Sequence, residues 1–151
     1  MKKSILGGII LAVVMAGIQL IPVNYNQTEE ISEKDIFTVY TISKEAETML
    51  KKACYDCHSN NTNYPWYNKI QPISWFLSNH IIKGKQELNF SEFGLYSKRK
   101  QKSKLSGIEN QINDGKMPLK SYKLLHKEAR LNKLEKEEIS KMVKNLSNQL
   151  N

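Results

Sequence analysis

Two cysteines and a histidine stand together in the pentapeptide Cys54-Tyr55-Asp56-Cys57-His58, which holds both cysteines of the 151-residue chain. On a helix, positions 54, 57 and 58 are related as i, i+3 and i+4, so their side chains share one face. Two thiols at this spacing followed by an imidazole are typical of a c-type haem attachment site. The pentapeptide therefore predicts one covalently attached haem c, bound through Cys54 and Cys57, with His58 as a ligand of the iron.

Three other chemistries are open to the same residues. A redox-active dithiol shares the spacing, but it occurs where a strand enters a helix, and no such pattern surrounds residue 54. A disulfide would suit an exported chain, although it leaves His58 without a role. A zinc site would need a fourth ligand, which His80, His126 or a carboxylate could supply. We expect haem rather than any of these.

An electron-carrying iron needs a second axial ligand, and the chain offers three candidates. We favour Met117, because a thioether on a loop braced by Gly115 and Pro118 is a common sixth ligand that raises the reduction potential. The alternative for Met117 is packing against the porphyrin without a bond to iron. His80 would give bis-histidine ligation, or else a hydrogen-bonded histidine beside the haem; His126 lies among charged residues and is expected near the surface. The predicted metal ligands are thus His58 and Met117.

Large aromatic side chains follow the pentapeptide and are expected to form the walls of a haem crevice. The alternative is an aromatic core that does not touch the cofactor. Trp66 or Tyr67 could also hydrogen-bond a haem propionate. The aromatic candidates are Trp66, Tyr67, Trp75, Phe76 and Phe90. The predicted cofactor-binding residues are Cys54, Cys57, His58, Trp66, Tyr67, Trp75 and Met117.

The first 23 residues predict a membrane anchor. Lys2 and Lys3 precede an apolar run from Ile5 to Val23, which suits a secretory signal or one membrane helix. No small-x-small cleavage signal follows the run, and no nearby cysteine could carry a lipid. We therefore expect an uncleaved anchor in the inner membrane, with the lysines in the cytoplasm and the remainder on the periplasmic side. A cleaved signal peptide is the alternative.

The rest of the chain predicts one small all-α domain, with residues 24–41 as a polar tether and residues 42–151 as the haem-binding domain. Helical periodicity runs through every regular segment, and no convincing β-strand is present. We expect the first and last helices of the domain to pack together. The first expected helix begins after an N-cap at Ser43 and leads into the pentapeptide. The second runs from Ile73 to Lys85, where Gly84 could stop it, and the third spans 103–114 before Gly115. The last begins after a capping box of Asn132 and Glu135, and its apolar stripe consists of Leu134, Ile139, Met142, Val143, Leu146 and Leu150.

The chain is basic, with a formal net charge of +8. Without Lys2 and Lys3, its 23 basic side chains become 21 against 15 acidic ones, so the exported part has a formal charge of +6. The run Lys98 to Lys104 has five basic residues and no acidic one. It is a candidate docking surface for an acidic redox partner, since charge steering speeds encounters. The alternatives are a solvated loop or a patch against anionic lipid. Nucleic acid is not expected as a partner outside the cytoplasm.

Short motifs after the pentapeptide give a family resemblance over roughly residues 45–145. The chain resembles the bacterial haem-binding domain family of small c-type cytochromes, whose members are short and begin with a hydrophobic segment. The resemblance implies an exported or membrane-tethered monohaem cytochrome. Phe93 stands where tryptophan is common and Lys127 where proline is common, and neither is a proposed ligand. The motifs are Asn63-Tyr64-Pro65-Trp66-Tyr67, Ile70-Gln71-Pro72, His80-Ile81, Gly84, Leu88-Asn89-Phe90-Ser91-Glu92-Phe93, Gly115-Lys116-Met117-Pro118 and His126-Lys127-Glu128-Ala129.

The function that the sequence predicts is single-electron transfer by a membrane-anchored monohaem c-type cytochrome, with redox proteins as partners and no enzymatic activity. One alternative is a haem enzyme or a gas or redox sensor, in which the sixth iron position is open or weakly held. The other is a structural or metal-binding module without haem.

Overall fold

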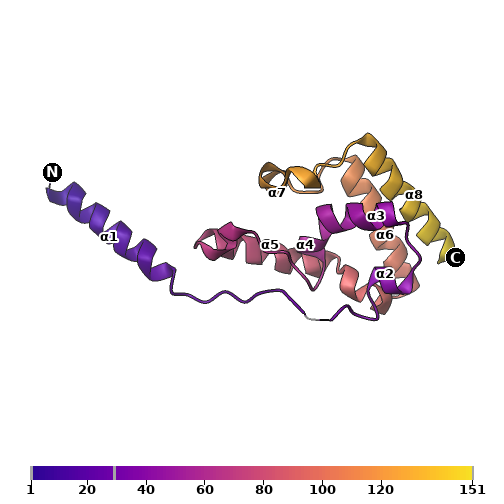
Figure 1. The fold of residues 1–151 in the computed structure, drawn as a ribbon, viewed down its shortest axis with the longest axis horizontal. Helices are drawn as coiled ribbons and strands as arrows, with labels where there is room; N and C mark the ends of the chain where they lie inside the picture. Colours follow the sequence, from indigo (N-terminus) through magenta and orange to yellow (C-terminus); the bar gives the residue numbers. More distant parts are fainter. Residues whose placement is uncertain (1, 29, 151) are drawn as a thin grey trace.

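The computed structural model describes residues 2–28 and 30–150, and every regular element in them is a helix, which confirms the predicted all-α class. Met1, Glu29 and Asn151, which the predicted anchor, tether and domain include, lie outside the described residues. Figure 1 shows the arrangement of the helices. The elements are α1 (Lys2–Ile18), α2 (Ile36–Val39), α3 (Lys44–Leu50), η1 (Lys51–Tyr55), α4 (Asp56–His58), η2 (Trp66–Lys69), α5 (Ile73–Glu87), η3 (Phe90–Leu95), α6 (Lys98–Asn113), α7 (Lys120–Leu125), η4 (Lys127–Ala129) and α8 (Lys133–Gln149).

Helices α3, α6 and α8 form a helical frame around the core (Figure 1), with α8 in contact with both α3 and α6. This confirms that the first helix of the domain packs against the last. Leu50, Leu105 and Leu146 are fully buried there, because an apolar stripe on each helix is covered by its neighbours. The predicted capping box of Asn132 and Glu135 at the start of α8 is also confirmed. The apolar stripe expected on α8 is wrong at one position, because Leu134 is 74% exposed.

Helix α5 lies beside the frame and contacts α4 and η2. It begins at Ile73, as predicted, and runs to Glu87, two residues beyond the predicted end at Lys85, so the expectation that Gly84 could stop the helix is wrong. Gly84 instead allows a close approach between α5 and α4. A Cβ at position 84 would lie 2.5 Å from the backbone oxygen of Cys57, so only glycine lets α5 pack this tightly against α4.

Helix α6 is longer than predicted, because it begins at Lys98 rather than at Ser103. The side chain of Ser97 caps it by accepting a hydrogen bond from the backbone N–H of Lys100 at 3.4 Å. The basic run 98–104 therefore forms the first turns of a helix rather than a loop. Gly115 follows the end of α6 with a φ of 67°, a conformation that favours glycine and that agrees with the predicted helix end.

The segment predicted as a polar tether packs against the domain at both of its described ends. Asn26 donates to Ser59 and Thr62, while the backbone oxygen of Lys34 accepts from Gly94 at 2.8 Å. Ile36 in α2 is fully buried in the core. The segment therefore makes buried contacts that its polar composition did not indicate. The boundaries of the tether and of the domain stay a prediction.

The first helix, α1, is 17 residues long and carries apolar side chains that are exposed on all sides. No helix in residues 2–28 and 30–150 has both the length and the apolar character that crossing a membrane requires. The predicted membrane helix over residues 1–23 is thus not supported by the helix lengths. Just after α1, Gln19 exchanges hydrogen bonds with the backbone of Gln71, at 3.2 and 2.9 Å.

Candidate functional site

The pentapeptide 54–58 spans the junction of two helical segments. Its first residues complete η1, a π-helical turn, and its last three form α4. A π-helical turn inserts an additional residue into a helix and is often found at functional sites. The two residues between the cysteines are held by separate anchors, which fix how the cysteines and His58 are presented.

Tyr55 is anchored in part by residues of the segment 24–41, which was predicted as a polar tether. Its ring is stacked between Phe37, at 5.0 Å between ring centroids, and Phe90, at 5.1 Å. Its hydroxyl donates to the carboxylate of Asp35 at 3.0 Å. Burial raises the pKa of the Tyr55 hydroxyl, and the carboxylate of Asp35 adds to the shift, so the hydroxyl remains a donor.

Asp56 is anchored to a loop and to α7. Its carboxylate accepts from the backbone N–H of Asn63 at 3.0 Å and from the hydroxyl of Tyr122 at 2.6 Å. Its backbone oxygen accepts from the hydroxyl of Thr62, also at 2.6 Å. Burial is the main cause of a raised pKa at Tyr122, with the hydrogen bond to Asp56 second. These contacts tie the middle of the pentapeptide to residues 62–63 and 122.

Two adjoining cavities lie against the pentapeptide, with volumes of about 240 Å³ and about 340 Å³. Cys54, His58 and Met117 line both, and Cys57 lines the smaller one. The structure therefore brings the two cysteines and both predicted iron ligands to one space, which we call the haem cavity. The residues common to both parts are Ala53, Cys54, His58, Glu87, Met117 and Pro118.

His58 is oriented by the backbone of α5 and the residue after it. Its Nδ1 lies 2.8 Å from the backbone oxygen of Gly84 and 3.0 Å from that of Leu88. Since a carbonyl can only accept, Nδ1 carries the proton and Nε2 keeps a lone pair for a metal. Burial lowers the pKa of His58 although both carbonyls oppose the shift, so the imidazole is neutral at neutral pH. A neutral imidazole with Nε2 free is the form that binds iron.

Both cysteines are free thiols. Burial raises the pKa of Cys54 to about 12 and that of Cys57 to about 11. At neutral pH both are therefore protonated and poor nucleophiles, unlike the low-pKa cysteines of dithiol oxidoreductases. In the described part of the chain, no three His, Cys, Asp or Glu side chains are grouped so that they could hold a metal ion.

The walls of the haem cavity suit a flat apolar ring. Leu88, Phe90, Ile108 and Ile112 contribute apolar surface to its larger part. Gly107 in α6 also lines this part, and a Cβ there would meet nothing within 4 Å, so the helix leaves open space beside its backbone. The apolar walls, the open face of α6, both thiols and a neutral imidazole fit a covalently attached haem.

The candidates for the sixth ligand are placed differently. Met117 lines both parts of the haem cavity, and its backbone N–H donates to the oxygen of Gln111 at 3.1 Å, which holds the loop after α6. His80 lines only the smaller part, and its Nδ1 lies 2.7 Å from the oxygen of Phe76. His126 lines neither part. Its Nε2 lies 2.8 Å from the Tyr67 hydroxyl, its Nδ1 lies 3.0 Å from Glu128, and its ring stacks on Tyr122.

The predicted aromatic walls are only partly brought to the haem cavity. Phe90 lines its larger part. Trp66 is 76% exposed and Trp75 is 41% exposed, and neither they nor Tyr67 and Phe76 line the cavity. Trp66, Tyr67 and Trp75 were predicted to bind the cofactor, and their contact with a bound haem stays a prediction.

Several residues of the site escaped the sequence analysis. Leu88 supports His58 through its backbone oxygen, which leaves no trace in side-chain pattern. Tyr122 belongs to a six-residue helix too short to show periodicity. Lys104 and Glu87, an ion pair at 3.7 Å, line the cavity from two different helices. Asp56, between the two cysteines, could have pointed to Tyr122, because a carboxylate at that place needs hydrogen-bond donors.

Comparison with known proteins independently indicates haem binding. A family model described as a haem-binding domain matches residues 13–145. The match includes the pentapeptide, both parts of the haem cavity and each candidate iron ligand. Neither a curated protein nor a solved structure was found to match the chain.

Proposed function

Because the chain belongs to the haem-binding domain family, we propose that it is a monohaem c-type cytochrome that carries single electrons outside the cytoplasm. The observation that carries the proposal is the joint placement of Cys54, Cys57 and His58 on one cavity, with Nδ1 of His58 committed to backbone oxygens. When bound, haem c supplies an iron that changes its charge by one electron.

Each protein group has a distinct task. Cys54 and Cys57 would bond the porphyrin edge through thioethers, so the cofactor cannot dissociate during turnover. The iron would be held by Nε2 of His58 and by the thioether of Met117. The apolar walls around Phe90 and Ile108 would limit the water beside the haem, which lowers the solvent reorganisation that accompanies electron transfer.

The electron-carrying role rests on the sixth ligand. With Met117 on the iron, no coordination position is left for a substrate or a gas. The hydrogen bonds from Lys116 and Met117 to the oxygen of Gln111 favour a fixed loop over one that must open. An electron carrier therefore suits the geometry better than an enzyme.

We further propose that the N-terminal segment holds the protein at the membrane, although α1 is shorter than a membrane-spanning helix. The apolar side chains of α1 are exposed, among them Ile5, Leu11 and Val13. Such a helix is stable in an apolar environment, and covalent haem attachment is expected outside the cytoplasm. We therefore assign the haem domain to the periplasmic side of the inner membrane, held there by the N-terminal segment. Fractionation of cells and the mass of the mature chain test this, and a shortened chain in the soluble fraction would replace the anchor by a cleaved signal.

The optical spectrum of the detergent-extracted, full-length protein tests the cofactor and the sixth ligand together. We expect covalently retained haem after denaturation, and a low-spin ferric spectrum with the long-wavelength band of methionine ligation. The variant M117A should lose this band, bind added imidazole and have a lower potential, whereas the matched variant H80A should keep the wild-type spectrum. A high-spin spectrum in the wild type would point to an enzyme or sensor with an open iron. Loss of the band in H80A alone would make His80 the ligand.

A further inference from the structure

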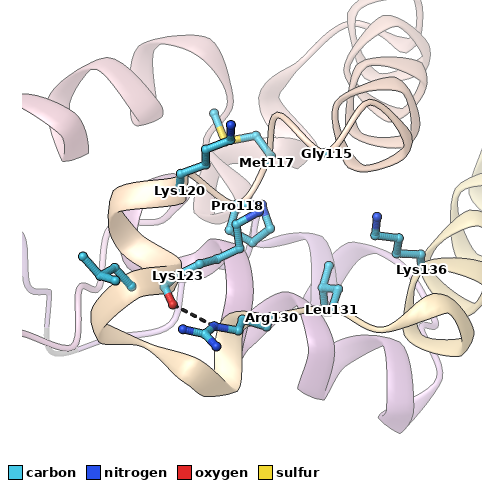
Figure 2. A pocket seen from close by; sticks show the side chains of 9 residues that line it. Gly115, Met117, Pro118, Lys120, Lys123, Arg130, Leu131 and Lys136 are labelled. Atoms are coloured by element: carbon cyan, nitrogen blue, oxygen red, sulfur yellow. Dashed lines mark hydrogen bonds between the residues drawn. The ribbon is translucent and has the colours of Figure 1, made fainter.

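A third cavity, of about 360 Å³, lies on the loop that carries Met117. It shares Met117 and Pro118 with the haem cavity, and its other lining residues are different. Figure 2 shows its walls, which come from the loop after α6, from α7, from the segment after η4 and from the first turns of α8. We call it the basic groove. Its lining residues include four cationic side chains and no acidic one: Lys120, Lys123, Arg130 and Lys136.

The groove is held in shape by the backbone of α7. Nε of Arg130 donates to the backbone oxygen of Lys123 at 2.9 Å, the hydrogen bond drawn in Figure 2. This bond fixes Nε of the guanidinium group, while its two terminal nitrogens have no ion pair with a described residue. The side-chain nitrogens of Lys120, Lys123 and Lys136 have no hydrogen bond or ion pair with any other residue that the structure describes.

The carboxylates that are close in sequence to the groove residues pair with side chains outside the groove. Glu128 pairs with His126, and Glu135 pairs with Lys52 while it also completes the capping box of α8. Asp114 and Glu137 pair with Lys116 and Lys133. The four cations are thus gathered in one cavity without a counter-charge from the described chain. Such an arrangement raises the local positive potential and favours an anion from outside.

The floor of the groove is apolar. Pro118, Leu124 and Leu131 lie among the cations, and Leu124 is 71% exposed. A small inorganic anion would leave this surface in water. A polypeptide segment that alternates carboxylates with apolar side chains would neutralise the cations and cover the leucines at the same time.

We propose that the basic groove is the docking site for an acidic segment of the redox partner protein, an inference that rests on the proposed electron-transfer function. Met117 and Pro118 line both the groove and the haem cavity, so a docked segment lies one loop away from the iron ligand. The basic run 98–104 is less available. Lys104 in it is paired with Glu87, and Lys100 lies over the ring of Tyr96 at 3.9 Å.

A binding measurement with full-length, haem-loaded protein in detergent tests the groove. The probe is a fluorescent, glutamate-rich peptide that contains leucine, titrated at low and high salt. The groove variant K120Q/K123Q/K136Q is compared with K98Q/R99Q/K144Q, which removes three exposed cations elsewhere. We expect the groove variant to bind on the order of 100-fold more weakly and the control within about threefold of wild type, with the difference shrinking at high salt.

Equal losses in the two variants would reduce the effect to net charge and overturn the proposal, as would absence of peptide binding to the wild type. Binding of phosphatidylglycerol vesicles in place of the peptide, lost in the groove variant, would assign the groove to lipid and also overturn it. Potentiometric reduction of the same samples is a separate readout. A haem that cannot be reversibly reduced would refute electron transfer, whatever the peptide does.

Discussion

The helical frame and the haem side of the molecule are stabilised by different means. In the frame, Leu50, Leu105 and Leu146 are covered by neighbouring helices. On the haem side, α5 buries only Ser74 and Ile81, and its approach to α4 depends on a glycine and on backbone oxygens that hold His58. The frame therefore has its own hydrophobic core, whereas we expect the haem side to gain apolar contacts from a bound haem.

The largest expected effect separates the two regions directly. The variant C54A/C57A should retain no haem after denaturation, because both thioethers are lost. Amide hydrogen exchange should then show α5 and the 115–118 loop losing part of their protection while they stay folded, whereas α8 keeps its protection in full. Haem-stained denaturing gels and exchange mass spectrometry measure the two parts. If α8 lost protection to the same extent, the frame would depend on haem and the two regions would form one unit.

A substitution in the frame should lower stability and leave the haem site unchanged. Leu146→Ala removes a fully buried side chain and should lower the free energy of unfolding by about 2–5 kcal/mol, with the haem spectrum of the folded protein unchanged. Leu134→Ala, at an exposed position in the first turn of α8, is the matched control and should change the free energy of unfolding by less than about 0.5 kcal/mol. Chemical denaturation followed by circular dichroism gives both values, and similar losses would mean that α8 is not buried as described.

Much of the frame could be predicted from the sequence, because its signals are local. The capping box of α8, the N-cap of α3 and the glycine after α6 each involve residues a few positions apart. The sequence also singled out residues whose type the chemistry dictates, namely the cysteines, His58 and Met117; the structure brings them to one cavity, and their binding of haem stays a prediction. The rest depends on contacts between distant segments. Polar composition concealed the buried Ile36 in the supposed tether, and a glycine that ends helices in many proteins serves packing at position 84.

Gly84→Ala would sharpen the comparison on the haem side. Its Cβ would lie 2.5 Å from the backbone oxygen of Cys57, so α4 and α5 must separate. In the haem-free C54A/C57A background we expect a loss of about 1–3 kcal/mol in the free energy of unfolding, as for other overpacked sites. Gly107→Ala in the same background should cause no loss, because nothing lies within 4 Å of its Cβ and alanine favours helix. A neutral Gly84→Ala would show that the two helices can move apart freely.

The smallest effect concerns an ion pair that joins η1 to α8. Lys52 and the backbone N–H of Asn132 hold the pKa of Glu135 below its ordinary value of 4.5. Because the folded pKa is the lower one, this stabilisation is present above the unfolded pKa and is lost as pH falls through the folded pKa. Glu135→Gln should cost about 1 kcal/mol at pH 7 and less at pH 3. Unfolding at both pH values measures it, with the exposed Glu137→Gln as control, and a pH-independent cost would exclude the ion pair as its cause.

The thiols of the pentapeptide have a consequence for the order of assembly. In the folded domain, Tyr55 is clamped between Phe37 and Phe90, and the raised pKa values of Cys54 and Cys57 keep both thiols protonated at neutral pH. A folded chain without cofactor would thus present both thiols to the cavity in their less reactive form. We therefore expect haem ligation on an exported, still open chain, with packing of the segment around Asp35 against Tyr55 as a late step.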